Sequence, residues 1–120
     1  MLEPVGPPPE PQIVEAVVPR EDEIIFEKFV PNAFLGTCFE WWLRSYGVKT
    51  IILTGINVAT GINGTAREAI NLGFYAIVAT DCVATPNETD YHAAVQYMEK
   101  IFDLYHSSKI IAAWSATKRR

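Results

Sequence analysis

The sequence lacks any apolar run long enough to cross a membrane. Its 120 residues are 49% hydrophobic, but its apolar stretches, such as residues 51–53 and 75–78, are short. A membrane-spanning helix needs about 20 consecutive apolar residues. No signal peptide is visible, because Met1 is followed by acidic and proline-rich sequence. We therefore expect a cytoplasmic protein that does not associate with membranes.

Positive charge is also scarce. Ten lysines and arginines stand against fourteen aspartates and glutamates, so that the formal net charge is -4. A general phosphate-binding surface is disfavoured by this balance. The only basic cluster is residues 118–120, which is typical of a solvated chain end. We expect no nucleic-acid partner.

Cysteine and histidine are few and scattered. Cys38 and Cys82 are the two cysteines, and neither belongs to a C-x-x-C motif. His92 and His106 are isolated as well. We expect both thiols to be reduced and to act as small packing residues, since free cysteine is often buried. The spacing predicts no metal site and no cofactor.

The prolines are concentrated at one end, because five of the eight lie within residues 1–12. Proline-rich chain enters sheets and helices with difficulty, so residues 1–12 are predicted to form an extended arm. Residues 13–114 then hold a single domain, the most that this length allows. Residues 115–120 are expected to be a polar tail that frays.

The central region alternates between two kinds of pattern. Short apolar runs predict strands at residues 24–28, 48–53, 74–79 and 109–114. The second of these is expected to be buried on both faces, because its apolar run is continuous. Helical spacing is found between the runs. Strands that alternate with helices favour an α/β fold with a parallel sheet.

Local signals mark where the helices begin and end. Thr37 and Glu40 have the spacing of a capping box, in which each side chain bonds the backbone N–H of the other residue. Gly47 is expected to end that helix in a left-handed conformation. Pro86 is expected at the first position of a later helix. The tryptophans are predicted to lie in the core or an interface: Trp41, Trp42 and Trp114.

Several motifs follow one another in an order that resembles the isochorismatase-like hydrolases, a family that includes nicotinamidases and carbamoylsarcosine amidases. The resemblance covers residues 13–114. It is carried by Pro19, Asp22, Ile24, Ile25, Lys28, Asn32–Phe34, Gly36–Thr37, Leu43, Gly47–Val48, Leu53–Ile56, Thr65–Ala69, Leu72–Phe74 and Asp81.

The resemblance implies a three-layer α-β-α fold of Rossmann-like type around a mostly parallel sheet with strand order 3-2-1-4-5-6. The strand that ends near Lys28 would be the third, and the strand that ends at Leu53 the fourth. The chain would therefore be incomplete and correspond to the C-terminal half. We expect it to form a homo-oligomer, to swap elements between copies, to require a separate N-terminal half, or to be a poorly stable truncated product.

The family's chemistry, as the resemblance implies it, uses an aspartate, a lysine and a cysteine at a strand-to-helix elbow. Lys28 matches the lysine, whereas Gly61 occupies the nucleophile position and no residue matches the aspartate. A cis peptide before the elbow would fall at Ile56–Asn57, leaving the N–H groups of Asn57 and Gly61 to bind an oxyanion. Asp81 resembles a structural aspartate of the family.

Three functions stay open on this basis. The first is a domain of a family that hydrolyses small amides or enol ethers, inactive alone, with a small carbonyl or carboxylate ligand bound at Lys28. The second is an active enol-ether hydrolase in which Lys28 and an aspartate outside this chain act as acid and base. The third is a non-catalytic ligand-binding or protein-interaction module, formed by dimerisation or with a separate N-terminal half.

Overall fold

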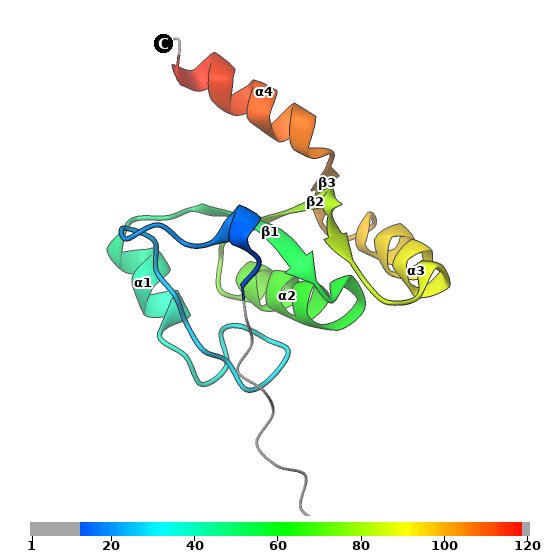
Figure 1. The fold of residues 1–120 in the computed structure, drawn as a ribbon, viewed down its shortest axis with the longest axis horizontal. Helices are drawn as coiled ribbons and strands as arrows, with labels where there is room; N and C mark the ends of the chain where they lie inside the picture. Colours follow the sequence, from blue (N-terminus) through cyan, green and yellow to red (C-terminus); the bar gives the residue numbers. More distant parts are fainter. Residues whose placement is uncertain (1–12, 119–120) are drawn as a thin grey trace, which may run out of the picture.

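The computed structural model describes residues 13–118, so the predicted arm at residues 1–12 lies outside the described residues. Helices and strands alternate from residue 39 onward (Figure 1). In chain order the elements are η1 (Glu15–Val17), α1 (Phe39–Ser45), β1 (Thr50–Ile56), η2 (Val58–Ile62), α2 (Asn63–Asn71), β2 (Tyr75–Ala84), α3 (Glu88–Met98), β3 (Asp103–Tyr105) and α4 (Ser107–Lys118). No helix among these described residues is long and apolar enough to traverse a membrane.

The strands form one parallel sheet in the order β1-β2-β3. Ile51 pairs with Ala76, and Ile77 pairs with Asp103. The register between β1 and β2 shifts after Leu53, so the last residues of the two strands pair beyond this irregularity. The predicted α/β fold with a parallel sheet is confirmed.

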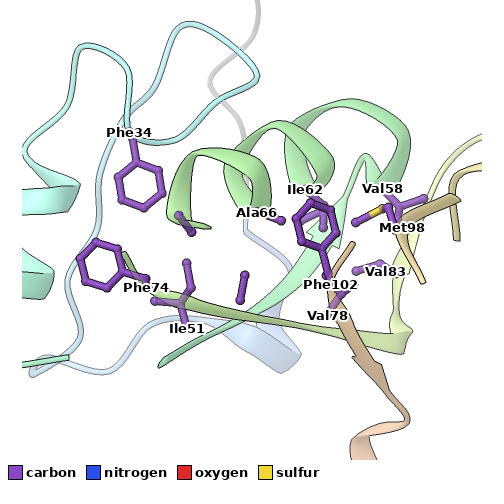
Figure 2. Close-up of a cluster of buried hydrophobic side chains, with 12 residues drawn as sticks. Phe34, Ile51, Val58, Ile62, Ala66, Phe74, Val78, Val83, Met98 and Phe102 are labelled. Carbon is purple, nitrogen blue, oxygen red and sulfur yellow. The ribbon is translucent and has the colours of Figure 1, made fainter. Parts of the chain in front are cut away.

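The core lies between α2 and one face of the sheet (Figure 2). Val58, Ala66, Ala69, Val78 and Met98 are completely shielded from solvent. The small alanines of α2 let its backbone approach the sheet, and larger side chains fill the remaining space. This packing sets α2, and with it the turn that precedes it, firmly against the ends of β1 and β2.

Strand β1 is less buried than its sequence predicts. Only Ile51 is buried along it, and Ile56 is 77% exposed. The prediction of burial on both faces is therefore wrong for the described residues. The reason is that β1 forms an edge of the sheet there, paired with β2 alone.

The segment at residues 24–28 forms no strand, contrary to the prediction. It lies outside every helix and strand, and Ile24 and Ile25 are exposed. A strand is stabilised by pairing with a neighbour, and none is present beside this segment in the described residues. Phe26 still contacts the domain, with its ring edge-on to that of Phe39 at 5.5 Å between centroids.

The segment at residues 109–114 is helical rather than extended, so this predicted strand is also wrong. The third strand is the short β3, and α4 begins two residues after it and continues through the predicted polar tail to Lys118. Asp81 accepts hydrogen bonds from the Ser107 N–H at 2.7 Å and from Ser107 Oγ at 2.6 Å. A carboxylate at a helix N-terminus favours the helix, a tertiary contact that the pattern of α4 does not reveal.

The start of α1 differs from a capping box. Thr37 Oγ1 accepts from the Phe39 N–H at 3.2 Å and itself donates to the Ala33 carbonyl. The Glu40 carboxylate does not bond the Thr37 N–H, because it pairs with Arg44 one turn later, at 2.8 Å. The structural role of Thr37 is thus to hold the turn before α1.

The other helix boundaries follow their sequence signals more closely. Gly47 and Gly73 adopt positive φ values of 65° and 87° just after α1 and α2. Helix α3 begins two residues later than expected, because Asn87 is its cap and accepts from the Asp90 N–H at 3.2 Å. Pro86 therefore precedes the cap instead of opening the helix.

Cys38 and Cys82 form no disulfide, as predicted, but both are exposed rather than packed in the core. Cys82 lies beside buried Val83, and successive residues of a strand point to opposite faces. Trp41 and Trp114 are also exposed, at 64% and 58%. Trp42 is half-buried, so none of the three tryptophans belongs to the buried core of the described residues.

The contact between Asp81 and α4 predicts a pH dependence. The hydrogen bonds from Ser107 hold the pKa of Asp81 below its ordinary value of 3.8. A carboxyl group with a lowered folded-state pKa stabilises the fold above its ordinary pKa, and this stabilisation is lost as the pH falls through the folded-state value. We expect Asp81→Asn to lower the free energy of unfolding at neutral pH. The difference in this free energy between the variant and the unmodified chain should disappear below pH 3.8.

Urea unfolding of both chains, followed by circular dichroism across this pH range, measures the effect. A gap that stays constant down to the lowest pH would contradict the assignment. Asp103→Asn is a matched control, since Asp103 is exposed, lies in a strand, and its side chain makes no hydrogen bond or ion pair recorded among the described residues.

Candidate functional site

A depression of about 430 Å³ lies where β1 ends and the chain turns toward α2. Ligands of open α/β sheets bind at this carboxyl end of the strands. The depression is lined by Lys28, Phe29, Val30, Pro31, Ile56, Asn57, Thr60 and Gly61. Two segments far apart in the sequence therefore build it, residues 28–31 and residues 56–61.

Lys28 and Gly61 are brought together in this depression. The Lys28 ammonium donates to the carbonyls of Val30 at 3.2 Å and Pro31 at 3.3 Å. A Cβ atom added to Gly61 would lie 4.0 Å from Lys28 Nζ and 3.4 Å from the Pro31 oxygen. A side chain at position 61 would thus meet the ammonium directly. Lysine has three N–H donors, so one is left for a ligand.

The elbow between β1 and α2 is organised by Asn57. The Ile56–Asn57 peptide is cis, as expected for this position. The Asn57 carbonyl accepts from the N–H groups of Thr60 at 3.3 Å and Ile62 at 3.0 Å, and its side chain accepts from the Ala59 N–H at 2.9 Å. The N–H of Asn57 itself has no acceptor recorded within residues 13–118.

Thr65 ties the two segments of the site to each other. Its side chain is only 4% exposed, and its hydroxyl accepts from the Ala33 N–H at 3.0 Å. Gly64 lies beside the same loop, since an added Cβ would be 4.0 Å from Asn32 Cβ. The loop that carries Lys28 is thereby held against the helix that follows Gly61. This role of Thr65 was not predicted from the sequence, although a threonine on the buried face of a helix indicates a hydroxyl that needs a hydrogen-bond partner.

Thr37 and Asp81 lie outside the depression. Thr37 holds the turn before α1, and Asp81 contacts the start of α4, where His106 Nε2 is 3.4 Å from its carboxylate. No acidic side chain lines the depression within the part of the chain that the structure describes. The same described part contains no group of three or more histidine, cysteine or acidic side chains arranged to hold a metal ion.

Replacing Thr65 by valine tests how the site is held together. The substitution keeps the shape of the side chain but removes the acceptor of the Ala33 N–H. We expect a loss of about 1–3 kcal/mol in the free energy of unfolding, the cost of an unpaired buried polar group. Hydrogen exchange at Ala33 and Lys28 should accelerate as well.

Thr60→Val serves as the control, because Thr60 is exposed and its hydroxyl makes no hydrogen bond recorded among the described residues. Equal stability of the Thr65 variant and the unmodified chain would contradict the proposed anchoring of the loop.

Comparison with known proteins points to one family. The model of the isochorismatase domain matches residues 2–108. The chain is 38% identical over 67 residues to the uncharacterized isochorismatase family protein YwoC of Bacillus subtilis, a match that covers 56% of this chain and 35% of that protein. It is 34% identical over 80 residues to a maleamate amidohydrolase of Pseudomonas putida, covering 67% of this chain and 37% of the enzyme.

Among solved structures, an isochorismatase-like hydrolase from Alkaliphilus metalliredigens superposes with a TM-score of 0.83 over 86% of this chain and 57% of its own, at 23% identity, and shows the same fold. The chain spans little more than a third of the length of these two curated relatives. The family model covers most of the sequence, and the chain belongs to the isochorismatase family of hydrolases.

Proposed function

We propose that this chain carries the lysine and elbow part of an isochorismatase-family site, with glycine at the position of the nucleophile. Such a site binds a small carbonyl or carboxylate ligand without forming a covalent intermediate. The observation that carries the proposal is the distance of 4.0 Å between Lys28 Nζ and the place of a Cβ at residue 61.

The charges and the space in the depression support a small anionic or polar ligand. Lys28 is held by two carbonyls and keeps one donor, and the Asn57 N–H is a second donor without a recorded acceptor in residues 13–118. A volume of about 430 Å³ lies within the range of small-molecule sites. Two donors among the residues that line one hollow suit an oxygen that bears negative charge.

Position 61 decides which chemistry the site supports. A thiol there would lie beside the Lys28 ammonium, which favours the reactive thiolate. The thiolate would then attack an amide carbon, as in covalent hydrolysis. Gly61 supplies no such group, and the lining residues include no carboxylate to serve as a base. We therefore expect the chain by itself to bind such ligands without hydrolysing amides.

A second candidate is the hydrolysis of enol ethers, which proceeds by proton transfer without a protein nucleophile. The open space at Gly61, next to Lys28, favours this chemistry over thiol chemistry. It needs a carboxylic acid to donate or accept the proton. That group would come from outside the described residues, from a further segment or from a partner chain.

A third candidate is an assembly role. Strand β1 is an edge of the sheet in the described residues, and Ile25 and Ile56 are exposed at 65% and 77%. An unpaired strand edge is a template for association. We propose that the chain forms a homo-oligomer or joins a separate N-terminal half. Size-exclusion chromatography with light scattering tests this, and a compact monomer with no tendency to associate would contradict it.

Binding of acetate tests the first proposal directly. We expect the amide signals of Asn57 and Gly61 to shift in an NMR titration with sodium acetate, and Lys28→Gln to abolish the shifts, because it removes the charge that attracts the carboxylate. Lys109→Gln is the matched control, since Lys109 is also exposed and lies on α4, outside the lining of the depression. Equal binding by all three chains, or no binding at all, would contradict the proposal.

Introducing a thiol tests the geometry of position 61. In a chain with Cys38→Ser and Cys82→Ser, we expect Gly61→Cys to react with iodoacetamide at about neutral pH roughly tenfold faster than an exposed reference thiol, because a nearby cation lowers a thiol pKa by about one unit or more. Adding Lys28→Gln should remove most of the gain. A rate that does not depend on Lys28 would show that the two positions do not meet.

The same variants are assayed on a small amide and an enol ether, with Gly61→Ala as the control for added volume. The unmodified chain should hydrolyse neither at a measurable rate. Amide hydrolysis by the unmodified chain would overturn the proposal that the site lacks a nucleophile.

A further inference from the structure

We propose that the groove between α1 and residues 22–26 binds the proline-rich segment of the same chain, residues 4–11. This groove shares no lining residue with the depression at Lys28. Nothing in the docking of the segment depends on the ligand site proposed above. The groove and the segment match in chemistry, because aromatic rings line the one and proline rings form much of the other.

The groove has a volume of about 430 Å³ and a mainly apolar lining. Helix α1 forms one wall, and the segment that runs beside it in Figure 1 forms the other. Much of this surface is open to solvent, since Tyr46 is 68% exposed and Ile24 is 43% exposed. Exposed apolar surface that gathers in one hollow is typical of an interaction site.

Four aromatic side chains supply flat faces in this lining. Trp42 and Tyr46 lie one turn apart on α1, and their rings are stacked with 5.4 Å between centroids and 16° between planes. The rings of Phe26 and Phe39 meet edge to face with 5.5 Å between centroids. Proline-rich segments dock in grooves lined by aromatic rings, because their polyproline II conformation forms before binding and costs little entropy.

Helix α1 also offers a hydrogen-bond donor. The hydrogen bonds that its side chains donate within residues 13–118 come from Arg44 and Ser45, and none is recorded from the Trp42 indole N–H. A polyproline II segment makes no internal backbone hydrogen bonds, so its carbonyls are available to accept from such a donor. Trp42 can therefore contribute both a ring face and an N–H.

Residues 4–11 have the composition that such a groove binds. They hold five of the eight prolines of the chain, and residues 7–9 are three prolines in a row. The segment lies outside the described residues, so its sequence is the evidence for its role. Polyproline II has about three residues per turn, which places Pro8 and Pro11 on one edge where both can face the rings.

The segment is long enough to reach the groove of its own chain. The described chain begins at Ile13, nine residues before Asp22, which lines the groove, and this stretch spans at most about 32 Å. The turn at residues 20–23, closed by a backbone hydrogen bond of 3.0 Å, brings its two ends closer. Pro4 precedes Ile13 by the same number of residues, and polyproline II rises about 3.1 Å per residue. Residues 4–11 can therefore lie in the groove without unfolding any described element.

Paramagnetic relaxation in the full chain tests the docking. A nitroxide label is attached to Leu2→Cys in a chain with Cys38→Ser and Cys82→Ser. We expect the label to broaden the indole N–H signal of Trp42, and reduction of the nitroxide with ascorbate to restore that signal. Trp114 is the internal reference and should stay sharp, because it belongs to α4, which lies apart from α1 (Figure 1).

Substitutions within the segment separate docking from mere proximity and leave the folded domain untouched. Pro7→Ser, Pro8→Ser and Pro9→Ser together should abolish the broadening at Trp42, because serine neither presets polyproline II nor offers a ring to the aromatic faces. The matched control combines Glu3→Gln, Gly6→Ser and Glu10→Gln. It changes as many residues of the same segment, keeps every proline and should retain the broadening.

The remaining outcomes would overturn the proposal. Absence of broadening at Trp42 would leave the groove to another partner, such as a separate N-terminal half. Broadening that persists in the triple serine variant would show that the prolines are not what the groove recognises. A mixture of isotope-labelled chains without nitroxide and nitroxide-labelled chains without isotope detects exchange between copies. Broadening of Trp42 in that mixture would assign the groove to the segment of a second copy.

Discussion

The site depends on the hydrogen bond from the Ala33 N–H to the buried Thr65 hydroxyl. This bond joins a loop without regular structure to a helix that is packed on the sheet. The loop that carries Lys28 contributes little to the core, apart from Phe34, whose ring lies between those of Phe39 and Phe74. These contacts anchor the loop, and hydrogen bonds to the carbonyls of Val30 and Pro31 then set the position of the Lys28 ammonium within it. The distance to Gly61 follows from them.

The elbow between β1 and α2 is held in position by a different set of interactions. Asn57 satisfies three N–H groups of the turn with its own carbonyl and side chain, so that the chain can reverse from β1 into α2 within a few residues. Val58 and Ile62 are buried beneath this turn. Their burial leaves Gly61 and Asn57 facing the loop of Lys28. The hydrogen bonds made by Asn57 and the burial of Val58 and Ile62 thus make the elbow a rigid side of the site for a small ligand.

Local patterns predicted much of this arrangement. The strands at residues 48–53 and 74–79 and the helix ends at Gly47 and Gly73 agree with the structure, apart from shifts of a few residues. The cis bond before Asn57 was implied by the resemblance to the family, and it is present as well. The failures have a common cause. Residues 24–28 have the composition of a strand but no neighbour to pair with, and α4 is helical where its pattern suggested a strand, with the side chain of Asp81 at its start. Both depend on contacts that no local pattern contains.

The sequence by itself determined the parallel α/β architecture, the family and the identity of the residue at the elbow. These follow from periodicity, turn chemistry and motif order, which are properties of neighbouring residues. Only the tertiary structure decided that Lys28 stands beside Gly61, that Thr65 holds the loop, and that Phe29 and Ile56 flank the same hollow. Side chains more than twenty residues apart meet only when the core packs, because distance in the folded chain is set by burial and hydrogen bonding rather than by position in the sequence.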